Sequence, residues 1–227
     1  IRTRELVRLM KKKKNGFTLI ELLVVISIFG ILMGLVVSQL GGVLGTSEKT
    51  KMQSILRTWV IKLKQYKTHY GYYPPFLYES GEGVATMLND PQDNQNRFLF
   101  SLKGKEKSDT GWSDGNSFED ENRDFKEFHS FSDDEFDEEG NLIAYESIRI
   151  LLDHDRDGAI VMDNSLVDEI FSSLSLEYDK SEMENLDSLR DNFSLINEDI
   201  AIFILSDETT NLSNLFSWNI EKYLSSD

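Results

Sequence analysis

Residues 11–26 read KKKKNGFTLIELLVVI, and they join a basic N-terminus to a long apolar run. Phe17 opens this run, which contains one carboxylate, Glu21, followed by 26 consecutive uncharged residues from position 22 to position 47. About 20 apolar residues are enough for a helix to cross a membrane. The stretch therefore predicts a single membrane-spanning helix, and the lysines before it predict a cytoplasmic N-terminus.

Charge divides the chain into four parts. The 227 residues include 24 Lys or Arg and 40 Asp or Glu, so the net charge is −16. The net charge is +6 over residues 1–16 and +5 over residues 48–70, but −26 over residues 71–227. We therefore expect a basic cytoplasmic segment at 1–16, an apolar helix at 17–47, a stem helix at 48–70 and an acidic head outside the cytoplasm at 71–227.

The composition also excludes several classes of function. Clustered cations are needed to bind a phosphate backbone, so we expect no nucleic-acid partner for so acidic a chain. The chain has no Cys, which excludes disulfide scaffolds, thiolate metal sites and Cys nucleophiles. It lacks the sequence motifs of phosphate loops, dinucleotide-binding loops, zinc hydrolases and Ser hydrolases. We therefore do not expect an enzyme.

Glu21 is the unusual residue of the apolar run. A lone carboxylate costs about 2.5–3.5 kcal/mol at the centre of a bilayer and less near its edge. One interpretation places Glu21 at the depth of the lipid headgroups, where it marks the beginning of the span. The other interpretation gives it a partner of opposite charge within an assembly.

The basic flank, the Gly16-Phe17 junction, the offset of Glu21 and the apolar length together resemble the prepilin signal of type IV pilins and type II secretion pseudopilins. This resemblance favours a partnered Glu21. It implies that a prepilin peptidase cleaves after Gly16, that Phe17 is N-methylated and that Glu21 meets the N-terminal amine of a neighbouring subunit. It also implies a single-pass protein of the bacterial inner membrane. An inner-membrane assembly platform would then build it, with copies of itself and other pseudopilins, into a periplasmic or cell-surface filament.

The stem predicts an amphipathic helix, because its apolar residues recur every three or four positions. This helix should end before Gly71, since Pro74 and Pro75 prevent it from resuming. The stretch HYGYYPP at residues 69–75 resembles the end of the same helix in major-type pseudopilins. We therefore expect an α+β, pilin-like fold in which a long N-terminal helix packs on a small antiparallel sheet. The expected apolar stripe consists of Met52, Ile55, Leu56, Trp59, Val60, Leu63, Tyr66 and Tyr70.

The head contains fewer clear signals. Apolar runs predict strands at 148–152, 159–162 and 199–205, a short helix at 165–174 and a closing strand near 215–218. Residues 104–141, here called the acidic segment, mix Phe with many carboxylates. We expect residues 133–139 to form a solvated loop, and the interleaved Phe residues to bring other parts of the segment back onto a core.

Between two of the expected strands, residues 153–158 read DHDRDG. Asp153, Asp155 and Asp157 followed by Gly match the first half of an EF-hand loop, in which alternate carboxylates turn toward one Ca²⁺. The second half does not match, because residue 164 is Asn and not Glu. A plain hairpin turn is the alternative, since Asp-Gly is also a turn signal. The loop additionally resembles the calcium-binding turn of major-type pseudopilins. The expected ligands are Asp153, Asp155, Asp157 and the carbonyl of Ala159, with Asp163, Asn164 or Asp168 completing the shell.

These patterns favour a structural subunit of a type II secretion pseudopilus, or of a related type IV pilus-like filament, involved in protein secretion across the outer membrane. The alternatives are a minor type IV pilin and a membrane-anchored periplasmic domain that binds calcium or another ligand. An ordinary membrane anchor has no use for Gly16-Phe17 combined with Glu21, which favours the filament subunit.

Overall fold

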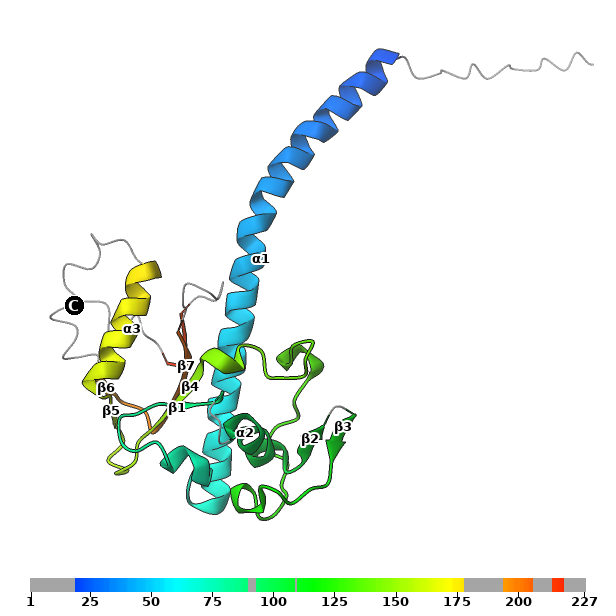
Figure 1. Cartoon of the computed structure of the whole chain (residues 1–227). Coiled ribbons are helices and arrows are strands. Elements are labelled where there is room, and N and C mark those ends of the chain that lie inside the picture. The colour runs from blue at the N-terminus through cyan, green and yellow to red at the C-terminus, as the bar shows by residue number, and fades with distance from the viewer. Residues whose placement is uncertain (1–18, 90–92, 109, 178–193, 206–213, 219–227) are drawn as a thin grey trace, which may run out of the picture. The chain divides into compact units, whose positions relative to one another are not determined.

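The computed structural model describes residues 19–89, 93–108, 110–177, 194–205 and 214–218 (Figure 1). The chain forms two compact units, residues 1–47 and residues 48–227, which we treat separately. Helix α1 (Leu19–Tyr70) contributes to both. The second unit is an α+β head with a small antiparallel sheet, as the sequence predicts.

The first unit contains the N-terminal part of α1. Its described side chains, at residues 19, 20 and 22–29, are exposed and mostly apolar. The predicted membrane run extends to residue 47, but the side chains of 30–47 lie outside the described set. Within the described part of the chain, no helix is long and apolar enough to cross a membrane.

In the second unit, the stem of α1 buries one face. Met52, Leu56, Trp59, Leu63 and Tyr66 are buried at alternating intervals of four and three residues, which confirms the predicted stripe. Three further members of the predicted stripe, Ile55, Val60 and Tyr70, are partly buried against the same core.

The stem also ends where the sequence predicts. Tyr70 is the last residue of α1, and Gly71 follows with φ +84°, a backbone conformation that side chains disfavour. Pro75 then begins the short 3-10 helix η1 (Pro75–Tyr78).

The sheet has the strand order β1-β4-β7-β8, and every pair is antiparallel. Its centre is the pair β4 (Ile148–Leu152) and β7 (Ile200–Ile204), in register with Ile150 opposite Ile202. The shorter strands β1 (Thr86–Met87) and β8 (Leu215–Phe216) lie at the edges. The predicted strands at 148–152 and 199–205 and the closing strand are thus confirmed.

Both faces of the central strands are covered. One set of alternate residues, including Ile150 and Ile202, belongs to the same core cluster as the stem. The other set, including Leu151 and Phe203, packs with helix α3 (Asn164–Glu177). Figure 1 shows the stem and α3 on opposite sides of β4 and β7. All five residues of β7 are therefore buried, which explains its unbroken apolar sequence.

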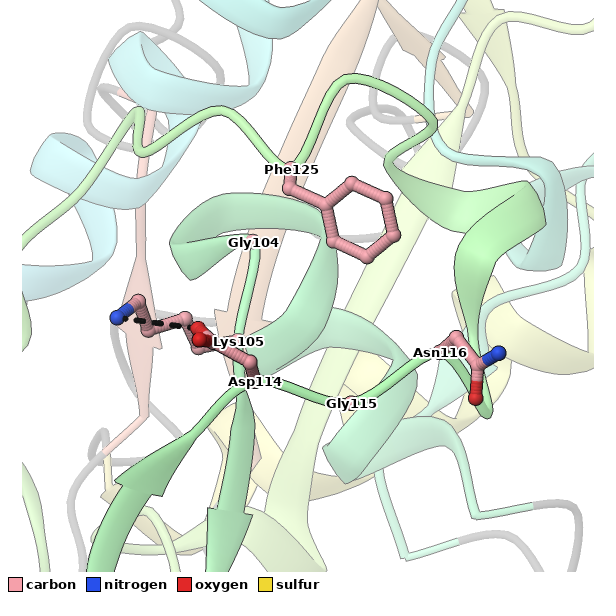
Figure 2. Close-up of a pocket in the computed structure, with 6 residues that line it drawn as sticks. All are labelled: Gly104, Lys105, Asp114, Gly115, Asn116 and Phe125. Carbon is pink, nitrogen blue, oxygen red and sulfur yellow. Dashed lines mark ion pairs between the residues drawn. The ribbon is translucent and has the colours of Figure 1, made fainter.

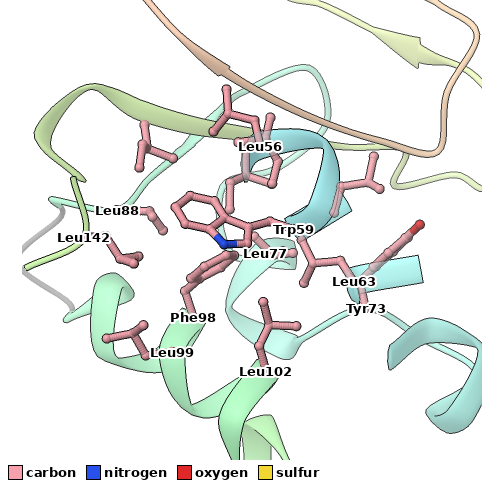
Figure 3. Packing of buried hydrophobic residues seen from close by; sticks show 14 of the residues in the cluster. Leu56, Trp59, Leu63, Tyr73, Leu77, Leu88, Phe98, Leu99, Leu102 and Leu142 are labelled. Carbon is pink, nitrogen blue, oxygen red and sulfur yellow. The ribbon is translucent and has the colours of Figure 1, made fainter. Parts of the chain in front are cut away.

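The helix α2 (Asn94–Lys103) completes the core around Trp59. The ring of Phe98 meets the ring of Trp59 edge-on, with centroids 5.3 Å apart, and Leu99 and Leu102 lie nearby (Figure 3). The remaining elements are short: β2 (Glu106–Ser108), β3 (Gly111–Ser113), η2 (Glu119–Glu121), η3 (Asp133–Glu135), η4 (Tyr145–Ser147), β5 (Ile160–Val161) and β6 (Leu195–Ile196). β2 pairs with β3, and β5 pairs with β6.

The buried stripe gives a direct test of this arrangement. Replacing the fully buried Leu63 by Ala should lower the free energy of unfolding by about 2–5 kcal/mol, because it removes buried methyl groups and leaves a cavity. Ile61 lies two residues away on the exposed face, so Ile61→Ala is the matched control and should change stability by less than about 0.5 kcal/mol. Denaturant unfolding of both variants measures the difference, and equal losses would contradict the assigned face of the stem.

Candidate functional site

The structure does not fully describe the residues that define the N-terminal signal. Gly16 and Phe17 are outside the described residues, and so is the side chain of Glu21, whose backbone belongs to α1. The candidate site that has a described geometry is the loop at residues 153–158, which follows the central strand β4.

The structure brings Asp153, Asp155 and Asp157 together. Each offers a carboxylate oxygen, and these oxygens lie within 4.8 Å of one another. Asp153 is buried, with 5% of its surface exposed, whereas Asp155 and Asp157 are exposed. The cluster therefore has one fixed carboxylate beneath two that face solvent.

Backbone amides organise this aspartate cluster. Both carboxylate oxygens of Asp153 accept backbone hydrogen bonds, from Arg156 at 2.7 Å and from Gly158 at 2.9 Å. One oxygen of Asp155 accepts from the amide of Asp157, and one oxygen of Asp157 accepts from the amide of Ala159. Among the described residues, the second oxygens of Asp155 and Asp157 have no recorded hydrogen-bond donor. They are consequently available to a cation.

The two strands on either side of this loop, β4 and β5, do not pair with each other as a hairpin. β4 pairs with β1 and β7, whereas β5 pairs only with β6 in the described sheet. The alternative of a plain hairpin turn is therefore wrong: the strand pairing carries β5 away from β4. The turn is made instead by left-handed backbone at Arg156 (φ +64°) and Gly158 (φ +96°).

The other expected ligands have different surroundings. Asp163 is not part of the group within 4.8 Å. Its Oδ1 atom accepts hydrogen bonds from the hydroxyl of Ser165 at 2.5 Å and from its amide at 2.8 Å, which lowers the pKa of Asp163. It thereby caps α3, whose first residue is the exposed Asn164. Ala159 lies half-buried between the loop and β5.

Asp199 connects the aspartate loop to the stem. Its carbonyl accepts a hydrogen bond from the amide of Asp153 at 3.1 Å. Its carboxylate accepts from the hydroxyl of Tyr73 at 2.7 Å and pairs with Lys67 at 3.0 Å and Lys64 at 3.1 Å. Burial alone would raise the pKa of Asp199, but these three donors outweigh it and lower the pKa to about 2.

The acidic segment also contacts the stem through polar groups. Glu135 is buried and accepts hydrogen bonds from Trp59 Nε1 at 2.7 Å and from His129 Nε2 at 3.0 Å. Burial would raise the pKa of Glu135, yet these donors and the amide of Ser132 lower it overall. The expectation of a solvated loop at 133–139 is therefore wrong for Glu135, because its carboxylate satisfies the buried indole N–H.

Another buried carboxylate lies where η1, α2 and η2 meet. Glu121 is 2% exposed and pairs with Arg97 at 2.6 Å, and it accepts from the amide of Phe76 at 3.2 Å. Desolvation nevertheless raises its pKa. The hydroxyl of Tyr66 donates to the Glu121 carbonyl at 2.5 Å, which links this group to the stem. Phe128, whose ring contacts that of Tyr66, and Phe131, whose ring contacts that of His129, are both buried, as the interleaved Phe residues predict.

Sequence reasoning missed these connecting residues. Lys64 and Glu198 are 134 positions apart, and Trp59 and Glu135 are 76 positions apart, so no local pattern links them. One signal was available for Glu135: the spacing from Ser132 to Glu135 is that of a capping box, which the structure contains.

Comparison with known proteins supports the N-terminal signal. Residues 11–37 match a family model described as the prokaryotic N-terminal methylation motif. This match supports the type IV pilin-like class and implies membrane anchoring, processing by a prepilin peptidase and assembly into a filament. The comparisons with curated proteins and with solved structures gave no match.

The lowered pKa of Asp199 predicts a specific acid sensitivity. A carboxylate whose folded pKa is depressed contributes stability above its unfolded pKa near 4, and this contribution is lost as the pH falls toward about 2. The protein should lose about 1–2 kcal/mol of unfolding free energy over this range through Asp199, a value reduced for its partial exposure. Urea unfolding between about pH 5 and about pH 2 measures this loss.

Asp199→Asn should flatten this part of the pH profile. Glu198→Gln is the matched control, because Glu198 contacts the same Lys64 but leaves the Asp199 contacts with Tyr73 and Lys67 in place. An unchanged pH profile in Asp199→Asn would show that the connection between loop and stem does not stabilise the fold through this charge.

Proposed function

We propose that the protein is a structural subunit of a type II secretion pseudopilus, or of a closely related type IV pilus-like filament. The observation that carries this proposal is the methylation motif at residues 11–37. A head whose stem helix packs on a small antiparallel sheet is consistent with it.

The proposed sequence of events follows from the residues of the motif. A prepilin peptidase removes residues 1–16 by cleavage between Gly16 and Phe17, on the cytoplasmic side of the inner membrane. The new amine of Phe17 is methylated. During assembly, Glu21 meets the positive amine of a neighbouring subunit, and this opposite charge offsets the cost of placing a carboxylate in an apolar environment.

Two buried carboxylates of the head favour a structural role over an enzymatic one. Glu121 and Glu135 are each buried and supplied with donors that join elements of the fold. Paired carboxylates used for acid–base catalysis need a reacting group between them and access to substrate. A minor pilin and a membrane-anchored binding protein are the alternatives.

We also propose that the aspartate loop binds Ca²⁺. Hard carboxylate oxygens are the ligands that Ca²⁺ prefers. Asp153, Asp155 and Asp157 fit this role, because their oxygens converge and the outer two aspartates retain oxygens without a recorded donor among the described residues. The bound ion would offset the mutual repulsion of three carboxylates. Through the contact between Asp153 and Asp199, it would hold the loop against the residue that precedes β7.

The filament proposal is tested first by the N-terminus of the protein extracted from its own membranes. Intact mass and N-terminal sequencing should find a chain that begins at methylated Phe17. A chain that retains residues 11–16 would contradict processing, and the protein would then be an anchored domain of another kind.

Glu21→Ala separates processing from assembly. The variant should still be cleaved and methylated, but filament yield by shearing and electron microscopy should fall strongly. Glu48→Ala is the matched control, because Glu48 is an exposed carboxylate of the same helix beyond the apolar run. Normal filament yield from Glu21→Ala would contradict the pairing of Glu21 with the amine.

The calcium proposal predicts a stability gain. At a calcium concentration about 100-fold above its Kd, the free energy of unfolding should rise by about 2.7 kcal/mol, which corresponds to an increase in Tm of about 5–10 °C. Asp155→Asn should remove most of this rise. Asp120→Asn, at an exposed aspartate outside the loop, should retain it. Identical melting curves with calcium and with chelator would contradict the proposal.

A further inference from the structure

A solvent-open pocket of about 520 Å³ lies beside the β2–β3 hairpin, within the acidic segment and apart from the aspartate loop. The pocket is lined by one aromatic ring, one carboxamide and one ion pair, together with glycine backbone (Figure 2). Its lining residues are Gly104, Lys105, Asp114, Gly115, Asn116 and Phe125. Neither the methylation motif nor the contacts with the stem use it.

The aromatic ring of the pocket is held by an unusual backbone. Phe125 has φ +50°, a left-handed conformation that is rare for an aromatic residue. Its amide donates to the carbonyl of Asn122 at 3.0 Å, and its ring meets Phe100 with centroids 5.9 Å apart in a T-shaped contact. Phe125 is still 45% exposed, and Figure 2 shows its ring directed toward the space between Gly104 and Asn116. The backbone and the contact with Phe100 thus hold the apolar ring of Phe125 in a solvent-exposed position.

Two glycines allow the walls to come this close. A Cβ atom at Gly104 would lie 2.5 Å from the backbone carbonyl of Phe125. A Cβ atom at Gly115 would lie 2.0 Å from the carboxyl carbon of Glu106, whose Oε1 atom accepts from the amide of Ser117 at 2.6 Å. The backbone of Phe125 therefore approaches position 104 as closely as only glycine allows, whereas at position 115 a larger residue would displace the Glu106 carboxylate.

The polar groups of the pocket include both hydrogen-bond donors and acceptors, and their net charge is zero. The Lys105 ammonium pairs with the Asp114 carboxylate at 3.3 Å, and both are solvated. The Asn116 carboxamide is exposed and has no side-chain partner within the described residues. The pocket thus offers a donor and an acceptor from one amide, further acceptors from one carboxylate and no net charge.

We propose that this pocket binds a neutral saccharide, with one pyranose ring stacked on Phe125 and its hydroxyls on Asn116 and Asp114. A pyranose presents an apolar C–H face and hydroxyls that both donate and accept, which are the two features of the lining. A phosphate-bearing ligand is disfavoured, because the one cation of the lining is already paired. A purely apolar ligand would leave the Asn116 carboxamide without a partner.

The test is saturation-transfer NMR on the full-length protein in a detergent without a sugar headgroup. The probes are glucose, galactose and N-acetylglucosamine, each as the free sugar and as its β1,4-linked disaccharide. At least one should receive saturation transfer from the protein, strongest at the C–H protons of one ring face. Absence of transfer to every probe would overturn the proposal.

Three variants locate the binding. Phe125→Ala should weaken it by about 2- to 12-fold, the loss expected for one aromatic contact. Asn116→Ala changes an exposed side chain that holds no element of the fold, and it should also weaken binding. Phe118→Ala is the matched control, because Phe118 contacts the same Phe100 but does not line the pocket. Equal affinity in Phe125→Ala and Phe118→Ala would overturn the site. Neither outcome bears on cleavage at Gly16 or on calcium.

Discussion

The buried stripe of the stem is the constraint on which the rest of the head depends. An isolated helix cannot hide the face formed by Leu56, Trp59 and Leu63, so other parts of the chain must cover it. The central strands β4 and β7 cover it on one side, and α2 with the acidic segment covers it on another. The buried indole N–H of Trp59 on this face also needs a hydrogen-bond acceptor, which Glu135 supplies.

The same constraint sorts the carboxylates of the head into two groups. A few are buried or partly buried, and each is supplied with donors at a junction between elements, as are Glu121, Glu135 and Asp199. Many others, including Asp155 and Asp157, point into solvent. The strong negative charge therefore lies mainly where water and counterions screen it, while the paired members join segments that are distant in sequence.

Local patterns explain how much of this could be predicted from the sequence. The period of the stem and the apolar runs at 148–152 and 199–205 predict elements that the structure contains, because burial imposes a period on the residues themselves. The pairing of β5 with β6 and the cover that α3 provides depend on contacts between separate segments, which leave no local signature. The unbroken apolar sequence of β7 is the one hint that both sheet faces are covered. At the site, the aspartate spacing predicts the cluster, whereas Asp199 and its lysines require knowledge of the fold.

The distance in sequence between the stem and its partners has a consequence for biosynthesis. The hydrogen bond of Trp59 cannot form until Glu135 has been synthesised. The ion pairs of Lys64 and Lys67 cannot form until the ribosome has added Asp199, more than 130 residues later. The stem therefore emerges with its apolar stripe uncovered, and the pair β4–β7 can close only after Ile204 has been added. Such late formation of long-range contacts slows folding and leaves an aggregation-prone apolar surface exposed until they form. During this interval, binding of a chaperone or of another chain to the uncovered stripe competes with the packing of the later strands of the head.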